Sequence, residues 1–278
     1  MESLISYFST IPSSHRSLIL VGGITFFWLL EGILPLVRFR YHKWKHAGVN
    51  FFFTFTTILV NFALAFILLK TSDWAVANEF GLLQWLPEMS LWLYGLIGLL
   101  SLDLIGAYTV HWSEHKVKWM WKFHLIHHTD THVDTTSANR HHPGESIFRF
   151  IFTTIGVLLI GTPMWIVFLY QSLSVVLSQF NHANISLPRW LDKGMSWLIV
   201  SPNMHKVHHH FQLPYTDSNY GNIFAIWDHI FGTYRDLSPD KIVFGVDTHM
   251  KQEENSRLAN LLQIPFQPYR PPQTQGND

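Results

Sequence analysis

The chain has 278 residues, of which only 14% are charged and 15% are aromatic; Lys and Arg together number 19, and so do Asp and Glu. This charged fraction is low for a soluble protein, and a formal net charge of zero offers no basic field for nucleic acid. Because the chain has no Cys, iron–sulfur clusters, thiolate-bound haem, Cys-containing zinc sites and disulfides are excluded.

Three apolar segments within residues 1–110 are predicted to cross a bilayer. They are 17–37, whose only acidic residue is Glu31, 48–69, and 90–110, which contains Asp103. Each is long enough for a hydrocarbon core of about 30 Å, and none shows the polar face of a soluble amphipathic helix. The first is too long for the apolar region of a signal peptide, and no small-residue cleavage motif follows it, so we expect no cleavable signal peptide.

The distribution of charge predicts the orientation of these spans. A basic segment with Arg and Lys at positions 38–45 separates the first two. Because cytoplasmic loops are rich in Lys and Arg, we expect this segment on the cytoplasmic side and the N-terminus and residues 71–87 on the other. The third span then brings residues 111–146 to the cytoplasm. Interleaved Lys and Trp at 116–123 favour an interfacial helix, with an ordinary amphipathic soluble helix as the alternative.

Residues 147–181 are expected to form a membrane hairpin. The uncharged run 151–180 is interrupted by Gly, Thr and Pro at 161–163. A single crossing would put His142 and His182 on opposite sides of the membrane. The two histidines could not then belong to one metal site, so we expect the chain to turn at 161–163. Each arm would have only about 15 residues, which is short for an upright span. A second soluble segment, 182–262, should follow, and the Pro- and Gln-rich residues 263–278 are expected to form a loose tail.

Histidine is concentrated in one part of the chain, where 13 of the 18 His lie between positions 111 and 210. A helix places residues i, i+3 and i+4 on one face, and neutral imidazole is the commonest protein ligand for metals. The pattern therefore predicts a polynuclear histidine metal site rather than a solvated His-rich surface. The motifs are HWSEH at 111–115, HLIHH at 124–128, RHHP at 140–143, NHAN at 181–184 and HKVHHH at 205–210.

Ligand chemistry alone leaves the metal open, since imidazole suits Zn, Cu, Fe and Ni. A zinc hydrolase ordinarily needs three ligands and an open position, far fewer than are present here. Attack on an unactivated C–H bond of a lipid, in contrast to hydrolysis, needs a high-valent oxidant. Two adjacent irons can supply one with O2 and two external electrons. A membrane zinc hydrolase of a lipid and a non-catalytic metal-binding or transport protein are the alternatives, although the first two spans offer no His and only one acid for a transport path.

These motifs, together with TDSNYGNIFAIWDHIFGTY at 216–234, resemble the fatty acid hydroxylase/sterol desaturase superfamily of membrane di-metal oxygenases over residues 102–235. The resemblance implies an all-α integral membrane bundle of about four spans or hairpin arms plus interfacial helices. A cytosolic histidine-rich cap would hold two iron ions, for which zinc could substitute. Trp112 departs from the Arg that often follows the first His of this family.

The resemblance also implies a ligand set and no catalytic residue beyond the metal centre. We expect His132, His141 and His210 to lie outside this set. The implied metal ligands are His111, His115, His124, His127, His128, His142, His182, His205, His208 and His209.

Four polar residues are candidates for accepting the second N–H of the ligand imidazoles, which metal-bound His nearly always donates. They are Asp103, Asp217, Asn219 and Asp228. The alternatives are a hydrogen bond to a neighbouring helix for Asp103 and turn chemistry for the others. Glu145 is expected to cap or support the start of a helix.

The implied activity is O2-dependent hydroxylation or desaturation of a membrane lipid by a non-haem di-iron enzyme. Sterol, fatty acyl, sphingoid and ether lipids and carotenoids all remain open as substrates. An external electron donor is expected, a reductase with a cytochrome or ferredoxin, and the oligomeric state is unknown. Because the His motifs follow directly after spans, we expect lateral access of the lipid to a pocket near residues 103–108 and 173–180.

Overall fold

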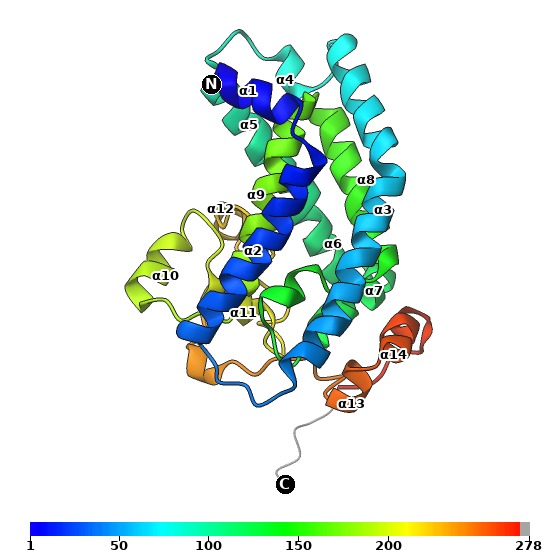
Figure 1. The fold of residues 1–278 in the computed structure, drawn as a ribbon, viewed down its shortest axis with the longest axis vertical. Helices are drawn as coiled ribbons and strands as arrows, with labels where there is room; N and C mark the ends of the chain where they lie inside the picture. The colour runs from blue at the N-terminus through cyan, green and yellow to red at the C-terminus, as the bar shows by residue number, and fades with distance from the viewer. Residues whose placement is uncertain (273–278) are drawn as a thin grey trace.

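The computed structural model describes residues 1–272, and long helices run along most of its length (Figure 1). The described residues form no β-strand, only isolated bridges such as Pro35 with Ile185. The predicted all-α class is confirmed. In chain order the helices are α1 (Glu2–Ser9), α2 (Ser13–Ile33), α3 (Lys43–Ala77), α4 (Leu82–Trp85), α5 (Leu91–Asp103), the π-helix η1 (Leu104–Thr109), α6 (Val110–Lys116), α7 (Lys118–His128), η2 (Thr135–Asn139), α8 (Pro143–Ile160), α9 (Met164–His182), α10 (Arg189–Met195), α11 (Pro202–His208), α12 (Ile226–Ile230), η3 (Pro239–Lys241), α13 (Gln252–Asn255), α14 (Leu258–Gln263) and η4 (Ile264–Phe266).

Within residues 1–272, four helical stretches are long and apolar enough to cross a membrane: Ser13–Ile33, Lys43–Trp85, Leu91–Lys116 and Pro143–Ile160. They include the three predicted spans and the first hairpin arm. The first ends earlier than expected because Pro35 cannot continue a helix and disfavours helical geometry at the residue before it.

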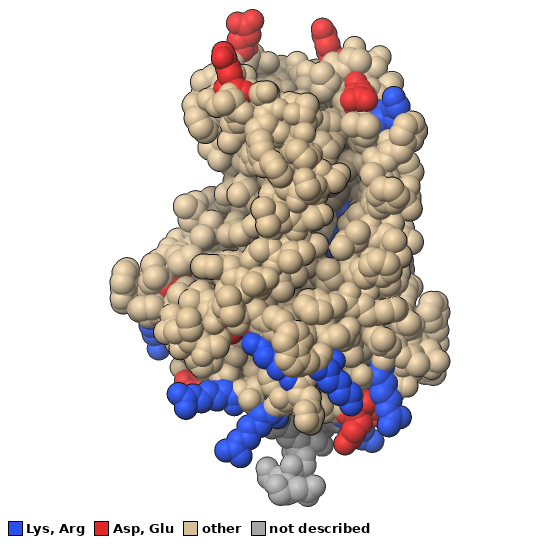
Figure 2. Space-filling view, viewed as in Figure 1, with Lys and Arg blue, Asp and Glu red and all other residues tan. Residues whose placement is uncertain are grey.

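The surface of the bundle matches a membrane setting. Large apolar side chains point outward, with Phe62 81% exposed and Leu29 67% exposed. Figure 2 shows mainly acidic side chains at one end of the molecule, Lys and Arg gathered with a few acidic side chains at the other, and an almost uncharged band between them. The basic end is the end at which α10, α11 and α13 lie in Figure 1. The four apolar helices and this band identify an integral membrane protein.

Helices α8 and α9 form a helical hairpin whose turn lies at the expected residues, while its place in the membrane stays a prediction. Gly161 has φ +70°, and its Cβ, if it had one, would lie 2.3 Å from the carbonyl oxygen of Phe80. Only glycine permits this approach, which seats the turn against the loop after α3. The arms α8 and α9 have 18 and 19 residues, longer than expected, because α8 already begins at Pro143.

The C-terminal segment differs from the prediction of a loose tail. Residues 264–266 form η4 against α7, and Lys122 Nζ donates to the carbonyl of Gln267 at 2.7 Å. Arg270 forms an ion pair with Glu254 at 2.6 Å. The prediction is therefore wrong for residues 263–272, while residues 273–278 lie outside the described part of the chain. The other segment boundaries, at 110, 146 and 181, stay predictions.

The orientation can be tested with single cysteines, because the natural chain has none to remove. Glu88 and Lys241 are both exposed. Glu88 lies between α4 and α5, at the end of the bundle away from α10 (Figure 1), whereas the segment just before Lys241 is tied to α10 by the ion pair of Asp236 with Lys193. We expect a membrane-impermeant thiol reagent to label Glu88→Cys only from outside intact cells and Lys241→Cys only after the membrane is opened. The Cys-free parent is the control, and labelling of both variants in intact cells would contradict the topology.

Candidate metal centre

Nine of the ten expected ligands gather in two adjacent groups at the basic end of the bundle. Within each group, one ligand nitrogen from every residue lies within 4.8 Å of all the others. The five-histidine group consists of His111, His115, His124, His128 and His208, and the four-histidine group consists of His127, His182, His205 and His209.

Helical geometry explains why there are two groups. His124 and His128 are one turn apart on α7 and both point into the five-histidine group, whereas His127 lies about 100° around the helix and points into the four-histidine group. The short helix α11 divides its ligands in the same way, with His208 in one group and His205 in the other. The two groups are therefore built on shared helices.

The residues fit a metal on the chemistry of their nitrogen atoms. Nδ1 of His111 donates to the carbonyl of Tyr220 at 2.8 Å, and Nδ1 of His208 donates to the carbonyl of Ser218 at 2.6 Å. Their Nε2 atoms are then lone-pair acceptors that face other imidazoles, with His111 and His124 Nε2 3.1 Å apart. Nε2 of His115 and of His208 is buried without a hydrogen-bond partner in the described structure. A cation would satisfy these nitrogens.

Burial also sets the protonation state of the ligands. It lowers the pKa of His124, His127 and His128 well below the usual histidine value, and the neighbouring imidazoles lower it further. These side chains are therefore neutral at physiological pH, which is the form that binds metal.

A buried carboxylate pair, which the sequence analysis did not assign to the metal centre, supports His124. Glu145 Oε1 accepts from His124 Nδ1 at 2.8 Å, and Glu114 Oε2 lies 3.6 Å from the same nitrogen. Arg149 binds both carboxylates, at 3.0 Å from Glu145 and 2.7 Å from Glu114. Its guanidinium occupies one oxygen of each carboxylate and offsets one of their two charges, so orienting His124 suits these carboxylates better than holding a third ion. The only sequence signal was their position beside His boxes.

Of the four expected supporting residues, only Asp217 contacts a ligand. Its Oδ1 lies 3.5 Å from Nδ1 of His115 and accepts from the Tyr220 hydroxyl at 2.9 Å. Burial acts to raise the pKa of Asp217, but hydrogen bonds from His115 and Lys116 hold it well below its usual value. Asp217 is therefore a carboxylate that fixes the orientation of His115.

The other three act through the backbone rather than on a histidine. Asp103 accepts from the amides of residues 223 and 224 and from Trp227 Nε1 at 3.0 Å, so it ties the third span to the segment after α11. Asp228 accepts from Tyr220 N and Gly221 N, both at 2.8 Å. Asn219, with φ +54°, donates to the carbonyls of residues 204 and 235. The last two shape the loop whose carbonyls meet His111 and His208.

His142 lies outside both groups, contrary to the expected set. It is the N-cap of α8, and its Nδ1 accepts from Gly144 N at 3.0 Å while its ring packs on Phe123. Because Pro143 starts the helix, residue 142 is extended and its side chain turns back on the first turn. The preceding residue, His141, faces the centre instead, with its ring centroid 4.8 Å from that of His127.

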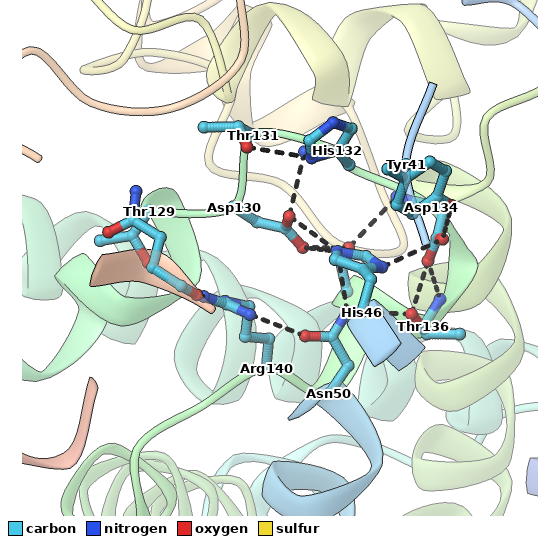
Figure 3. Close-up of polar contacts among 12 residues, drawn as sticks. Tyr41, His46, Asn50, Thr129, Asp130, Thr131, His132, Asp134, Thr136 and Arg140 are labelled. Atoms are coloured by element: carbon cyan, nitrogen blue, oxygen red, sulfur yellow. Dashed lines mark hydrogen bonds and ion pairs between the residues drawn. The ribbon is translucent and has the colours of Figure 1, made fainter. Parts of the chain in front are cut away.

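A buried polar network holds the segment between α7 and α8 against the start of α3 (Figure 3). His46 Nε2 lies 2.8 Å from Asp130 Oδ1, and the Tyr41 hydroxyl donates to Asp134 at 2.7 Å. The fully buried Arg140 donates to Asn50 Oδ1 at 2.9 Å and also to the carbonyl of residue 126 in α7. These bonds fix the path between two His motifs. His46 is thus structural, as expected for a histidine outside the ligand set.

Comparison with known proteins agrees with this geometry. Ornithine lipid hydroxylase OlsE of Rhizobium tropici is 24% identical over 129 residues, 46% of this chain and 38% of that protein. Alkylglycerol monooxygenase of Danio rerio is 32% identical over 165 residues, 59% of this chain and 35% of that protein. A cholesterol 25-hydroxylase-like protein of Danio rerio is 27% identical over 124 residues, 44% of this chain and 48% of that protein. The chain spans little more than a third of the length of the first two relatives. No solved structure matches it.

The family model described as fatty acid hydroxylase matches residues 95–233, which is half of the chain. This region begins in the third span, contains all nine histidines of the two groups, and ends with the loop that supports them. The chain belongs to the fatty acid hydroxylase family.

Proposed function

We propose that this protein is an O2-dependent di-iron oxidoreductase that hydroxylates or desaturates a membrane lipid. The observation that carries the proposal is the pair of adjacent, buried, all-histidine groups at the end of apolar helices. Relatives named as a lipid hydroxylase and a monooxygenase support lipid oxidation as the class of reaction. The number of histidines exceeds what metal-assisted hydrolysis needs.

The residues of this chain would hold and orient the metals. The five- and four-histidine groups would each bind one ion, and the two iron ions would supply the redox chemistry that activates dioxygen. Glu145, Asp217 and the backbone carbonyls beside the ligands accept their second N–H and so fix ring orientation. The buried position of both groups excludes bulk water from the reaction.

A cavity of about 360 Å³ supports a lipid as the substrate. It lies among α2, α3, α8 and α9 and is lined by Gly106 and Ser178, which belong to the two segments expected to form the pocket. His141 also lines it, and the ring of this residue contacts that of His127 in the four-histidine group. The cavity therefore leads from the membrane-spanning helices to the metal centre.

The side of the membrane and the source of electrons are parts of the same proposal. The ligand helices lie at the end where Lys and Arg gather (Figures 1 and 2), and the preference for basic cytoplasmic loops supports the cytoplasmic side for this end. An external donor, a reductase with a cytochrome or ferredoxin, would deliver two electrons there.

Metal content is the primary test. Purified under reducing conditions from cells supplied with iron, the protein should carry about two metal ions per chain by elemental analysis. His127→Ala and His208→Ala each remove one ligand from a different group, so each variant should lose at least one ion and all lipid oxidation. His15→Ala, at an exposed histidine far from the groups, is the control. Full occupancy and turnover in both ligand variants would refute the di-metal proposal, and turnover without O2 by a zinc-loaded protein would favour a hydrolase.

Glu145 should control metal affinity without binding the metal. Glu145→Gln keeps an oxygen that accepts from His124 but loses the charge that Arg149 balances, so we expect metal affinity to fall roughly 10- to 100-fold. Glu145→Ala should lower it further. Competition with a metallochromic chelator measures both. Unchanged affinity in both variants would show that His124 is oriented by other contacts.

The cavity can be tested by filling it. Gly106→Phe and Ser178→Phe place a ring in the cavity, and should change which lipids are oxidised while metal content is preserved. Gly32→Phe is a matched control, because a Cβ at Gly32 would meet nothing within 4 Å and the residue does not line the cavity. Mass spectrometry of lipids from cells that express each variant is the measurement. An unchanged product profile in both cavity variants would exclude this route for the substrate.

A further inference from the structure

The cavity opens between α2 and α3. These helices meet at the basic end, where Trp28 packs on Trp44 with ring centroids 4.9 Å apart and Lys43 lies 3.8 Å from Glu31. Further along, α2 packs mainly on α9 and α3 mainly on α8, so the two helices separate. Figure 2 shows the resulting cleft, in which atoms of Lys or Arg side chains, drawn in blue, are visible. A lipid could pass sideways through this opening from the hydrocarbon region.

The cavity wall contains a side-chain amide that has no hydrogen-bond partner among the described residues. Asn61 lies within the apolar sequence ILVNFALAF of α3, is exposed, lines the cavity, and makes no side-chain hydrogen bond within residues 1–272. Asn50, on the same helix, is fully buried and binds both Thr136 and Arg140. An unpaired amide at membrane depth is costly. Asn61 is therefore suited to a partner that enters the cavity.

A second donor lies at the same depth. Thr57 Oγ1 lies 2.9 Å from Ser146 Oγ, and α3 and α8 run in the same direction from this contact. Asn61 is four residues beyond Thr57 and Arg149 is three beyond Ser146, so both lie about one turn, roughly 5 Å, further along. Arg149 uses Nε and Nη2 for its two carboxylates, which leaves Nη1 outside these ion pairs. Both residues line the cavity.

This part of the cavity offers no unpaired positive charge. Arg149 faces two carboxylates, Glu114 and Glu145, and no other Lys or Arg lines this part of the cavity. Arg16 lines the opposite end, where its guanidinium lies 5.1 Å from the ring centroid of Phe168. An anionic group beside Asn61 would lose its hydration without gaining an unpaired cation, whereas an uncharged oxygen would gain hydrogen bonds.

We propose that the cavity selects a lipid whose polar group is an uncharged oxygen, such as a hydroxyl or an ether, and that this oxygen binds between Asn61 and Arg149. The inference rests on the proposed function in taking the cavity to be the substrate site, and it names the substrate class. The amide of Asn61 can donate to or accept from such a group, and Nη1 of Arg149 can donate to it. A charged lipid would find no unpaired cation at this position, and a plain hydrocarbon has no oxygen to form these hydrogen bonds.

The test compares three probes of equal chain length: hexadecanol, hexadecane and palmitate. Binding of each to the metal-loaded protein in detergent is measured by competition with radiolabelled hexadecanol. Wild type should bind hexadecanol about tenfold more tightly than either other probe, which corresponds to about 1.4 kcal/mol. Asn61→Leu should remove this preference, lowering hexadecanol binding about tenfold and leaving hexadecane binding unchanged.

Two controls make the outcome specific. Phe62→Leu changes a neighbouring side chain that faces outward, and it should leave all three affinities unchanged. Asn61→Gln keeps the amide and should retain most of the preference. Tightest binding of palmitate, equal binding of the three probes, or a preference that survives Asn61→Leu would each overturn the inference. The binding test needs no turnover, so it is independent of the metal-content test. If purified protein prefers hexadecanol but never binds two metal ions per chain, the proposed function is refuted and the inference about the cavity stands.

Discussion

The candidate metal centre depends on one constraint: nine imidazoles share a buried volume in which their acceptor nitrogens face one another. For example, Nε2 of His182 lies 3.0 Å from Nε2 of His205. A neutral imidazole carries only one N–H, so these rings cannot all form hydrogen bonds with one another. Such an arrangement is unfavourable unless a cation draws these lone pairs together. Carbonyls and carboxylates accept from the opposite nitrogen of several rings and so fix their orientation. The spans bring the helices that carry these histidines to one end of the bundle.

The parts that could be predicted from sequence were those set by local spacing. Intervals of four residues placed His111 with His115 and His124 with His128, and long uncharged runs located the spans. The hairpin turn followed from Gly and Pro at 161–163 together with the requirement that His182 reach the same end as the other motifs. These features need no knowledge of distant contacts, because helical period and bilayer thickness determine them.

The parts that could not be predicted depend on tertiary contacts. The choice between His141 and His142 is the exception, because Pro143 marks the start of α8 in the sequence itself and makes residue 142 its cap. Glu114 and Glu145 are 31 positions apart and meet only because α6 and α8 pack together around Arg149. Asp103 was expected to support a metal ligand or to bind a neighbouring helix, but its partners lie in a segment 120 or more positions away, the amides of residues 223 and 224 and the side chain of Trp227. Local sequence carries no signal for such pairings.

Sharing of α7 and α11 between the two histidine groups has a consequence for metal loading. If each group binds one ion, as proposed above, an ion bound by His127 and His205 would hold both helices and would therefore also order His124, His128 and His208, which turn toward the other group. The first ion to bind would then bear the loss of conformational entropy on ordering the two helices. The second ion would bind ligands that are already ordered. The two ions should accordingly load cooperatively, so that partially filled protein is scarce at intermediate metal concentrations.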